Sequence, residues 1–95
     1  MTGMLKVNTT TDFDRAFKRL KKQNKDINKL LDVVRKIANG EILEKKYRDH
    51  KLIGYKTSDC RECHIEPDWL LIYKIYKDEL ILLLVTTGSH TNLFK

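Results

Sequence analysis

The apolar residues of this 95-residue chain recur at helical spacing in the first half and at sheet spacing in the second. Residues 5–8 are typical of a short opening strand, and Thr11 is the expected N-cap of a following helix. Two apolar stripes with a period near 3.6 come next, and Asn39-Gly40 ends the second. The stripes consist of Phe13, Ala16, Phe17 and Leu20, and of Ile27, Leu30, Leu31, Val34, Ile37 and Ala38. They predict a hairpin of two helices whose shared apolar side packs against a sheet.

The second half predicts that sheet. Residues 60–65 alternate between two faces, whereas residues 69–76 and 80–86 are nearly continuous runs of Leu, Ile, Val and Tyr. Such runs, joined by the polar residues 77–79, indicate adjacent central strands of an antiparallel hairpin. Pro67 cannot donate to a strand ladder, so it separates the first two of these strands.

The predicted fold is therefore α+β, a single domain spanning residues 1–95. The opening strand and the helix hairpin pack on one face of a mainly antiparallel sheet. The tail after Gly88 has room for one helical turn.

Composition narrows the function classes. The net charge of +6 and the pI of about 9.4 favour a polyanionic partner, although the same charge can serve solubility alone. Residues 1–6 carry no signal-peptide core, and no apolar run approaches the ~18 residues of a membrane span. We therefore expect a cytoplasmic protein with no membrane partner, whose two cysteines are reduced thiols.

The two cysteines raise alternatives. Residues 60–64 match C-x-x-C-H, the attachment motif of c-type haem, and Cys60, Cys63, His64 and His50 are possible zinc ligands. Haem attachment needs export, for which there is no signal, and a lone C-x-x-C lacks the second ligand pair of a structural zinc site. We favour Cys63 as a small core residue and Cys60 as a surface thiol.

The three histidines, His50, His64 and His90, carry the candidate chemistry together with Asp68. His64 and Asp68 flank one turn and His90 follows the neighbouring strand, so they can meet on the sheet face away from the helices. Histidine exchanges protons near neutral pH, and RNA brings its own nucleophile, the 2′-hydroxyl. Each residue also has a plainer interpretation: a surface histidine, an Asp68 that caps the turn, a Trp69 in the core.

Three segments also carry a family resemblance: Asp49-His50, residues 61–73 (RECHIEPDWLLIY) and residues 87–94 (TGSHTNLF). They resemble the YafQ branch of the RelE toxin superfamily, over essentially the whole chain. The resemblance implies a RelE-like fold and a toxin of a type II toxin–antitoxin system. Such toxins are endoribonucleases that cleave mRNA in the ribosomal A site and so inhibit translation.

The resemblance also implies residue roles. The catalytic positions correspond to His50, His64, Asp68, His90 and Phe94. His90 is the implied general acid, either Asp68 or His64 is the base, His50 supports the base or the phosphate, and Phe94 stacks on a nucleotide. The implied RNA-contacting residues are Trp69, Lys45, Lys46, Arg48, Lys18 and Lys22. No metal and no cofactor is implied, because imidazoles and a carboxylate supply the proton transfers.

The partners follow from the same resemblance. An acidic, DinJ-like antitoxin is expected to form a hetero-oligomer with the chain, which alone is expected to be monomeric. Two other function classes stay open: a non-catalytic basic module that binds RNA or protein, and a small metal- or haem-binding protein.

Overall fold

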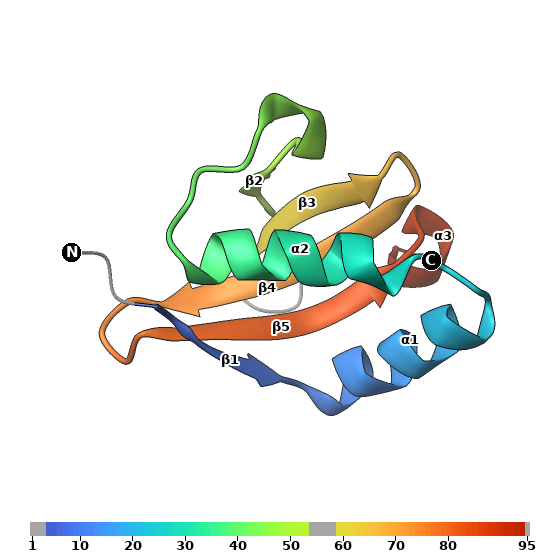
Figure 1. Cartoon of the computed structure of the whole chain (residues 1–95), viewed down its shortest axis with the longest axis horizontal. Helices are drawn as coiled ribbons and strands as arrows, with labels where there is room; N and C mark the ends of the chain where they lie inside the picture. Colours follow the sequence, from blue (N-terminus) through green and yellow to red (C-terminus); the bar gives the residue numbers. More distant parts are fainter. Residues whose placement is uncertain (1–3, 54–58, 95) are drawn as a thin grey trace.

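The computed structural model describes residues 4–53 and 59–94 and has an α+β fold (Figure 1). Its strands are β1 (Lys6–Thr9), β2 (His50–Lys51), β3 (Arg61–Glu66), β4 (Trp69–Tyr76) and β5 (Ile81–Gly88). Its helices are α1 (Thr11–Lys22), α2 (Ile27–Ala38), the 3-10 helix η1 (Lys45–Tyr47) and α3 (His90–Leu93). In the part of the chain that is described, no helix is long and apolar enough to cross a membrane.

The strands form one sheet in the order β1-β5-β4-β3-β2. Only the β1–β5 pair is parallel, so the predicted mainly antiparallel sheet is confirmed, with β4 and β5 in its interior. The sequence pattern gave no partner for β1. In the structure, β1 lies at one edge of the sheet, next to β5, and the two long helices follow it in the chain (Figure 1).

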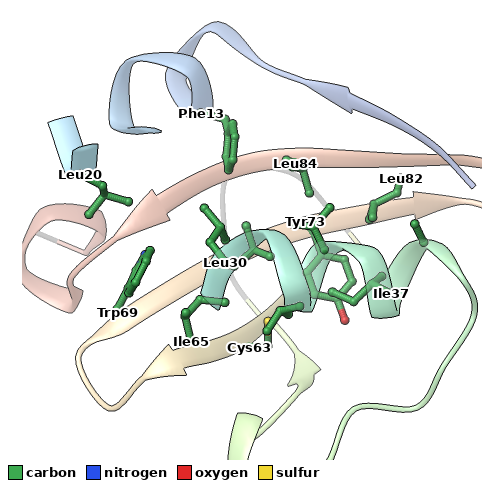
Figure 2. Close-up of a cluster of buried hydrophobic side chains, with 14 residues drawn as sticks. Phe13, Leu20, Leu30, Ile37, Cys63, Ile65, Trp69, Tyr73, Leu82 and Leu84 are labelled. Atoms are coloured by element: carbon green, nitrogen blue, oxygen red, sulfur yellow. The ribbon is translucent and has the colours of Figure 1, made fainter. Parts of the chain in front are cut away.

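Both long helices cover the same face of the sheet, as the apolar stripes predict. Leu30 and Val33 of α2 and Leu20 of α1 pack against Trp69 and Leu82 of the sheet in one buried cluster (Figure 2). Burying a side chain of this size stabilises the fold by about 1.5–3 kcal/mol.

One member of the second stripe was wrongly assigned to this core. Leu31 is 49% exposed, whereas Val33, outside the predicted stripe, is 1% exposed. The helix turns Leu30, Val33 and Ile37 toward the sheet, which leaves Leu31 at the margin of the interface.

The first helix begins one residue earlier than predicted. Thr10, not Thr11, is the N-cap: its hydroxyl accepts a hydrogen bond from the Phe13 amide and donates one to the Val85 carbonyl. A tertiary contact with β5 therefore decides between two adjacent threonines that are equivalent in local sequence.

The predicted strands are confirmed with shifted ends. β3 begins and ends one residue late, and β5 runs to Gly88, which puts its end beside the candidate site. Leu80 belongs to the preceding turn, with φ of 56°, rather than to β5. The single turn predicted for the tail is α3. The short elements η1 and β2 were not predicted.

Candidate acid–base site

Strand register brings three of the predicted site residues to one end of the sheet. His64 lies opposite Leu70 of β4, and Leu70 lies opposite Gly88 of β5. Asp68 is two residues before Leu70 and His90 two residues after Gly88, so both project from the same end of this row. The ring centroids of His64 and His90 are 5.8 Å apart. His64 alternates with core residues of β3, which places it on the sheet face away from the helices.

His90 is held by the first turn of α3. Its Nδ1 lies 3.5 Å from Oδ1 of Asp68, and its backbone amide donates to the same oxygen over 3.4 Å. Ser89 caps the helix by accepting a hydrogen bond from the Asn92 amide. The Phe94 ring lies 6.1 Å from the His90 ring and is 42% exposed. The imidazole is thus oriented by a carboxylate on one side and accompanied by an exposed aromatic ring.

Glu62 belongs to this cluster and was missed as a site residue. It is 5% exposed, and its Oε1 lies 3.0 Å from Nε2 of His50, its partner in the β2–β3 register. The other ring nitrogen of His50 lies 3.1 Å from the Lys51 carbonyl, so both nitrogens have acceptors. The alternation of residues along β3 already placed Glu62 on the same face as His64, and this pattern could have identified Glu62 as a site residue.

His64 differs from the other two histidines in being buried, at 8% exposure. Burial lowers its pKa below the ordinary 6.5. The charges of Arg48, His90 and His50 act in the same direction, and Glu62 opposes them. Among the described residues, its buried Nδ1 has no hydrogen-bond partner, which further disfavours a ring protonated at both nitrogens. Both features favour the neutral form of His64.

The segment that carries His50 is anchored next to it. The Asp49 carboxylate accepts hydrogen bonds from the Arg61 guanidinium, over 3.1 Å, and from the Tyr73 hydroxyl. Burial, followed by the contact with Asp49, raises the pKa of Tyr73, so the hydroxyl keeps its proton and remains a donor. This network fixes the start of β2, and with it His50.

Glu62, His64 and His90 also offer a set of metal-ligand atoms. One carboxylate oxygen and two imidazole nitrogens lie within 4.8 Å of one another. Imidazole with carboxylate is a donor set that suits divalent transition metals such as zinc and copper. The residues present therefore fit a metal ion.

Trp69, an implied RNA-contacting residue, lies in the core. It is 1% exposed, and its Nε1–H donates to the Thr87 hydroxyl over 2.9 Å, which in turn donates to the Leu70 carbonyl. A ring buried this deeply cannot stack on a nucleobase, so Trp69 is a core residue.

The cysteines are both buried, each 0% exposed. The prediction for Cys63 is confirmed, and the prediction of a surface thiol at Cys60 is wrong, because the Cys60 side chain is fully buried. Burial raises the pKa of Cys63 to about 12. The buried, protonated thiol of Cys63 is poorly placed either to bind zinc or to add to a haem vinyl group, which argues against both cysteine-based alternatives.

The basic residues sort into those that border the site and those that do not. Lys46 and Arg48 line a cavity next to His64, while Lys45 does not. Arg19 and Lys25 line a cleft of about 240 Å³ that includes Asp68. Lys18 and Lys22 are exposed on α1 and line neither space.

Comparison with known proteins identifies the family of this chain. Residues 5–95 match the family model described as the bacterial toxin of a type II toxin–antitoxin system, YafQ. The mRNA interferase toxin YafQ of Escherichia coli K12 is 36% identical over 83 residues, which cover 86% of this chain and 87% of that protein.

Solved structures match over nearly their whole length. A metal-bound toxin from Helicobacter pylori has a TM-score of 0.90 and 45% identity, covering 96% of this chain and 100% of the other. The toxin of the E. coli DinJ–YafQ complex has a TM-score of 0.87 and 33% identity, covering 97% and 99%. A copper-bound mutant toxin from H. pylori has a TM-score of 0.87 and 37% identity, covering 96% and 100%.

The fold and these comparisons thus define a small α+β toxin of the RelE type. Within that class, the chain belongs to the YafQ family of type II toxin–antitoxin toxins.

Proposed function

We propose that this chain is an mRNA interferase, an endoribonuclease that cleaves mRNA in the ribosomal A site and so inhibits translation. The observation that carries the proposal is the pair formed by buried His64 and exposed His90, whose rings are 5.8 Å apart at one end of the sheet. His64 is buried, which favours its neutral form, whereas His90 is exposed and next to the Asp68 carboxylate. Such a difference in environment suits one histidine to act as a base and the other as an acid.

His64 is the proposed general base. It removes the proton from the 2′-hydroxyl, and the 2′-oxygen attacks the adjacent phosphorus. Its lowered pKa keeps the ring neutral and ready to accept this proton. Of the two bases that the resemblance leaves open, Asp68 is the less suited, because its carboxylate already faces His90.

His90 is the proposed general acid. As the phosphorus–oxygen bond breaks, His90 gives a proton to the departing 5′-oxygen, and the products are a 2′,3′-cyclic phosphate and a 5′-hydroxyl. Asp68 engages Nδ1 and thereby leaves Nε2 to face the substrate. His90 and Asp68 have side-chain exposures of 53% and 76%, so a bound RNA strand can reach them.

The remaining residues position these two. Glu62 holds His50 at the edge of the sheet, where an imidazole can face a phosphate oxygen. Phe94 offers an exposed ring on which a base can stack beside His90. Lys18, Lys22 and Lys45 are proposed to act at longer range, by attracting the polyanion.

Metal is not needed for these steps, and we propose that cleavage is metal-independent. A metal ion bound by Glu62, His64 and His90 would supply Lewis acidity, but it would also engage the two imidazoles that transfer protons. The proposed chemistry and metal binding therefore compete for the same side chains.

The proposed partner is an acidic antitoxin. The chain carries a net charge of +6, and a relative is known in the DinJ–YafQ complex. Charge of this sign steers an acidic protein toward the surface that also meets RNA. We place both interactions in the cytoplasm, where ribosomes and mRNA are found.

Expression of the chain without its partner tests the proposal. Wild type is expected to arrest growth and to produce new 5′ ends within coding sequences, whereas His90→Ala is expected to do neither. Thr91→Ala, an exposed neighbour on α3, is the matched control and should behave as wild type. Arrest by His90→Ala as strong as by wild type, without cleaved mRNA, would instead support the non-catalytic binding module.

A further inference from the structure

A cavity of about 430 Å³ opens beside β3, next to the acid–base cluster. It exists because β2 pairs only with Arg61 and Glu62, so the rest of this edge of β3 is not covered by a strand. The 3-10 helix η1 lies against β3 instead, and α2 and the β3–β4 turn close the other sides. The volume is within the range of about 300–1,000 Å³ that is typical of small-molecule sites.

His64 forms part of the cavity wall and also part of the acid–base cluster. Anything bound in the cavity therefore lies directly beside the proposed general base. His90 and Asp68 do not line it, so the cavity extends from the base side of the reaction centre only.

The cavity walls suit a nucleobase. Tyr47, Ile65 and Pro67 provide an aromatic ring and two aliphatic surfaces. A nucleobase has apolar faces and polar edges, and proteins hold single-stranded RNA bases by pairing such faces with aromatic and aliphatic side chains. The carboxylates of Asp32 and Glu66 lie at the same walls and can accept hydrogen bonds from base edges.

The cations around the cavity can bind the phosphate of a nucleotide whose base lies in the cavity. Lys29 is paired with Glu66 over 2.9 Å, but Lys46 and Arg48 form no ion pair within residues 4–53 and 59–94. Arg48 is held with φ of 50° and ψ of 43°, a left-handed conformation that is uncommon for a residue with a side chain. Such conformations concentrate at functional sites.

We propose that this cavity binds the nucleotide on the 5′ side of the cleaved phosphodiester and selects its base. The inference rests on the proposed function in one respect, the direction of the strand. The attacking 2′-hydroxyl belongs to the nucleotide 5′ of the scissile phosphate, so that nucleotide must lie on the side of the base, His64. Its base then enters the cavity, and its 3′-phosphate lies between Lys46 or Arg48 and the acid–base cluster.

The test uses nucleoside 3′-monophosphates, which carry the phosphate where this nucleotide has it. The full-length His90→Ala chain is titrated with each of the four, and with inorganic phosphate, while NMR follows the Ile65 methyl groups and the Tyr47 ring. We expect saturable shifts at both residues, with an affinity that differs among the four bases and exceeds that of phosphate. Lys46→Ala or Arg48→Ala should weaken binding about tenfold, the usual loss for one charged hydrogen bond.

Lys77→Ala is the matched control, because it removes the same charge from an exposed turn at the far end of β4. It should bind as the parent does, and thermal unfolding should show that all variants are folded. Equal affinity for phosphate and for all four nucleotides would overturn the proposal, as would shifts confined to the cleft of Arg19, Lys25 and Trp69.

Failure of this inference can be told apart from failure of the proposed function. If nucleotides do not enter the cavity while mRNA cleavage still depends on His90, only the binding site is wrong. If nucleotides bind in the cavity as described but His90→Ala cleaves as well as wild type, the site stands and the acid–base mechanism is wrong.

Discussion

Glu62 and His50 face each other across the β2–β3 pair, with Oε1 of the carboxylate 3.0 Å from Nε2 of the ring. The carboxylate is almost fully buried, with a side-chain exposure of 7%, whereas the imidazole has 52%. The buried Glu62 therefore holds the exposed His50 ring in place. The same carboxylate lies within reach of His64 and His90, so it is at the centre of all three imidazoles.

The first prediction concerns this carboxylate. Glu62→Gln keeps the size of the side chain but removes its charge. His50 then loses the carboxylate that orients it, and His64 loses the negative charge that raises its pKa. We expect kcat for mRNA cleavage to fall about 10–100-fold, the usual cost of removing a group that orients a functional histidine, with little change in KM. Steady-state cleavage of ribosome-bound mRNA over a range of substrate concentrations measures both constants.

Glu79→Gln is the control for this change, since Glu79 is an exposed acidic residue in the β4–β5 turn. An unchanged kcat in a folded Glu62→Gln protein would show that Glu62 serves only the structure.

The second prediction is a pH dependence. His64 must be neutral to accept a proton, and burial lowers its pKa. The acid limb of the kcat profile should therefore lie below pH ~6.5, the ordinary histidine value. Arg48 lowers this pKa further and Glu62 raises it, so the limb should move up in pH in Arg48→Gln and down in Glu62→Gln. Movement of the limb in the same direction in both variants would contradict His64 as the base.

Much of this fold was predictable because local pattern and tertiary packing agree. The helix stripes, the β4–β5 hairpin and the turn at Pro67 each follow from residues close in sequence. The position of β1 beside β5 was not predictable in this way, because a parallel pairing across more than 70 residues leaves no local signal. The short elements η1 and β2 depend on tertiary contacts for the same reason.

The site was predictable to the extent that it follows strand register. His64, Asp68 and His90 project from one row of paired residues, so a correct topology brings them together. Glu62 was missed because a charged residue in a strand is usually solvated, and only the pairing with His50 shows that it is buried and engaged. Trp69 shows the opposite error: a residue inside a functional motif can belong to the core.

The third prediction is inhibition by metal. Because Glu62, His64 and His90 can all bind one ion, Zn²⁺ or Cu²⁺ should slow cleavage by tying up both the base and the acid. EDTA should restore the rate of a metal-treated sample and leave an untreated sample unchanged. Isothermal titration should show that Glu62→Gln or His64→Ala weakens metal binding. Loss of activity with EDTA, recovered by added metal, would make the ion part of the catalytic machinery and reject the metal-independent mechanism.

The last prediction follows from the absence of an attacking group in the proposed mechanism. His64 only removes a proton and His90 only supplies one, so the nucleophile must be the 2′-oxygen of the substrate. A 2′-O-methyl or 2′-deoxy sugar immediately 5′ of the scissile phosphate should leave binding intact and abolish cleavage at that phosphate. The same change one nucleotide further toward the 3′ end should have no effect, because that sugar carries only the leaving 5′-oxygen. Mass spectrometry of the unmodified reaction should find a 2′,3′-cyclic phosphate on one fragment and a 5′-hydroxyl on the other. Cleavage of the 2′-blocked mRNA at the normal rate would require water or a protein side chain as the nucleophile, and His64 could then not keep the role assigned to it.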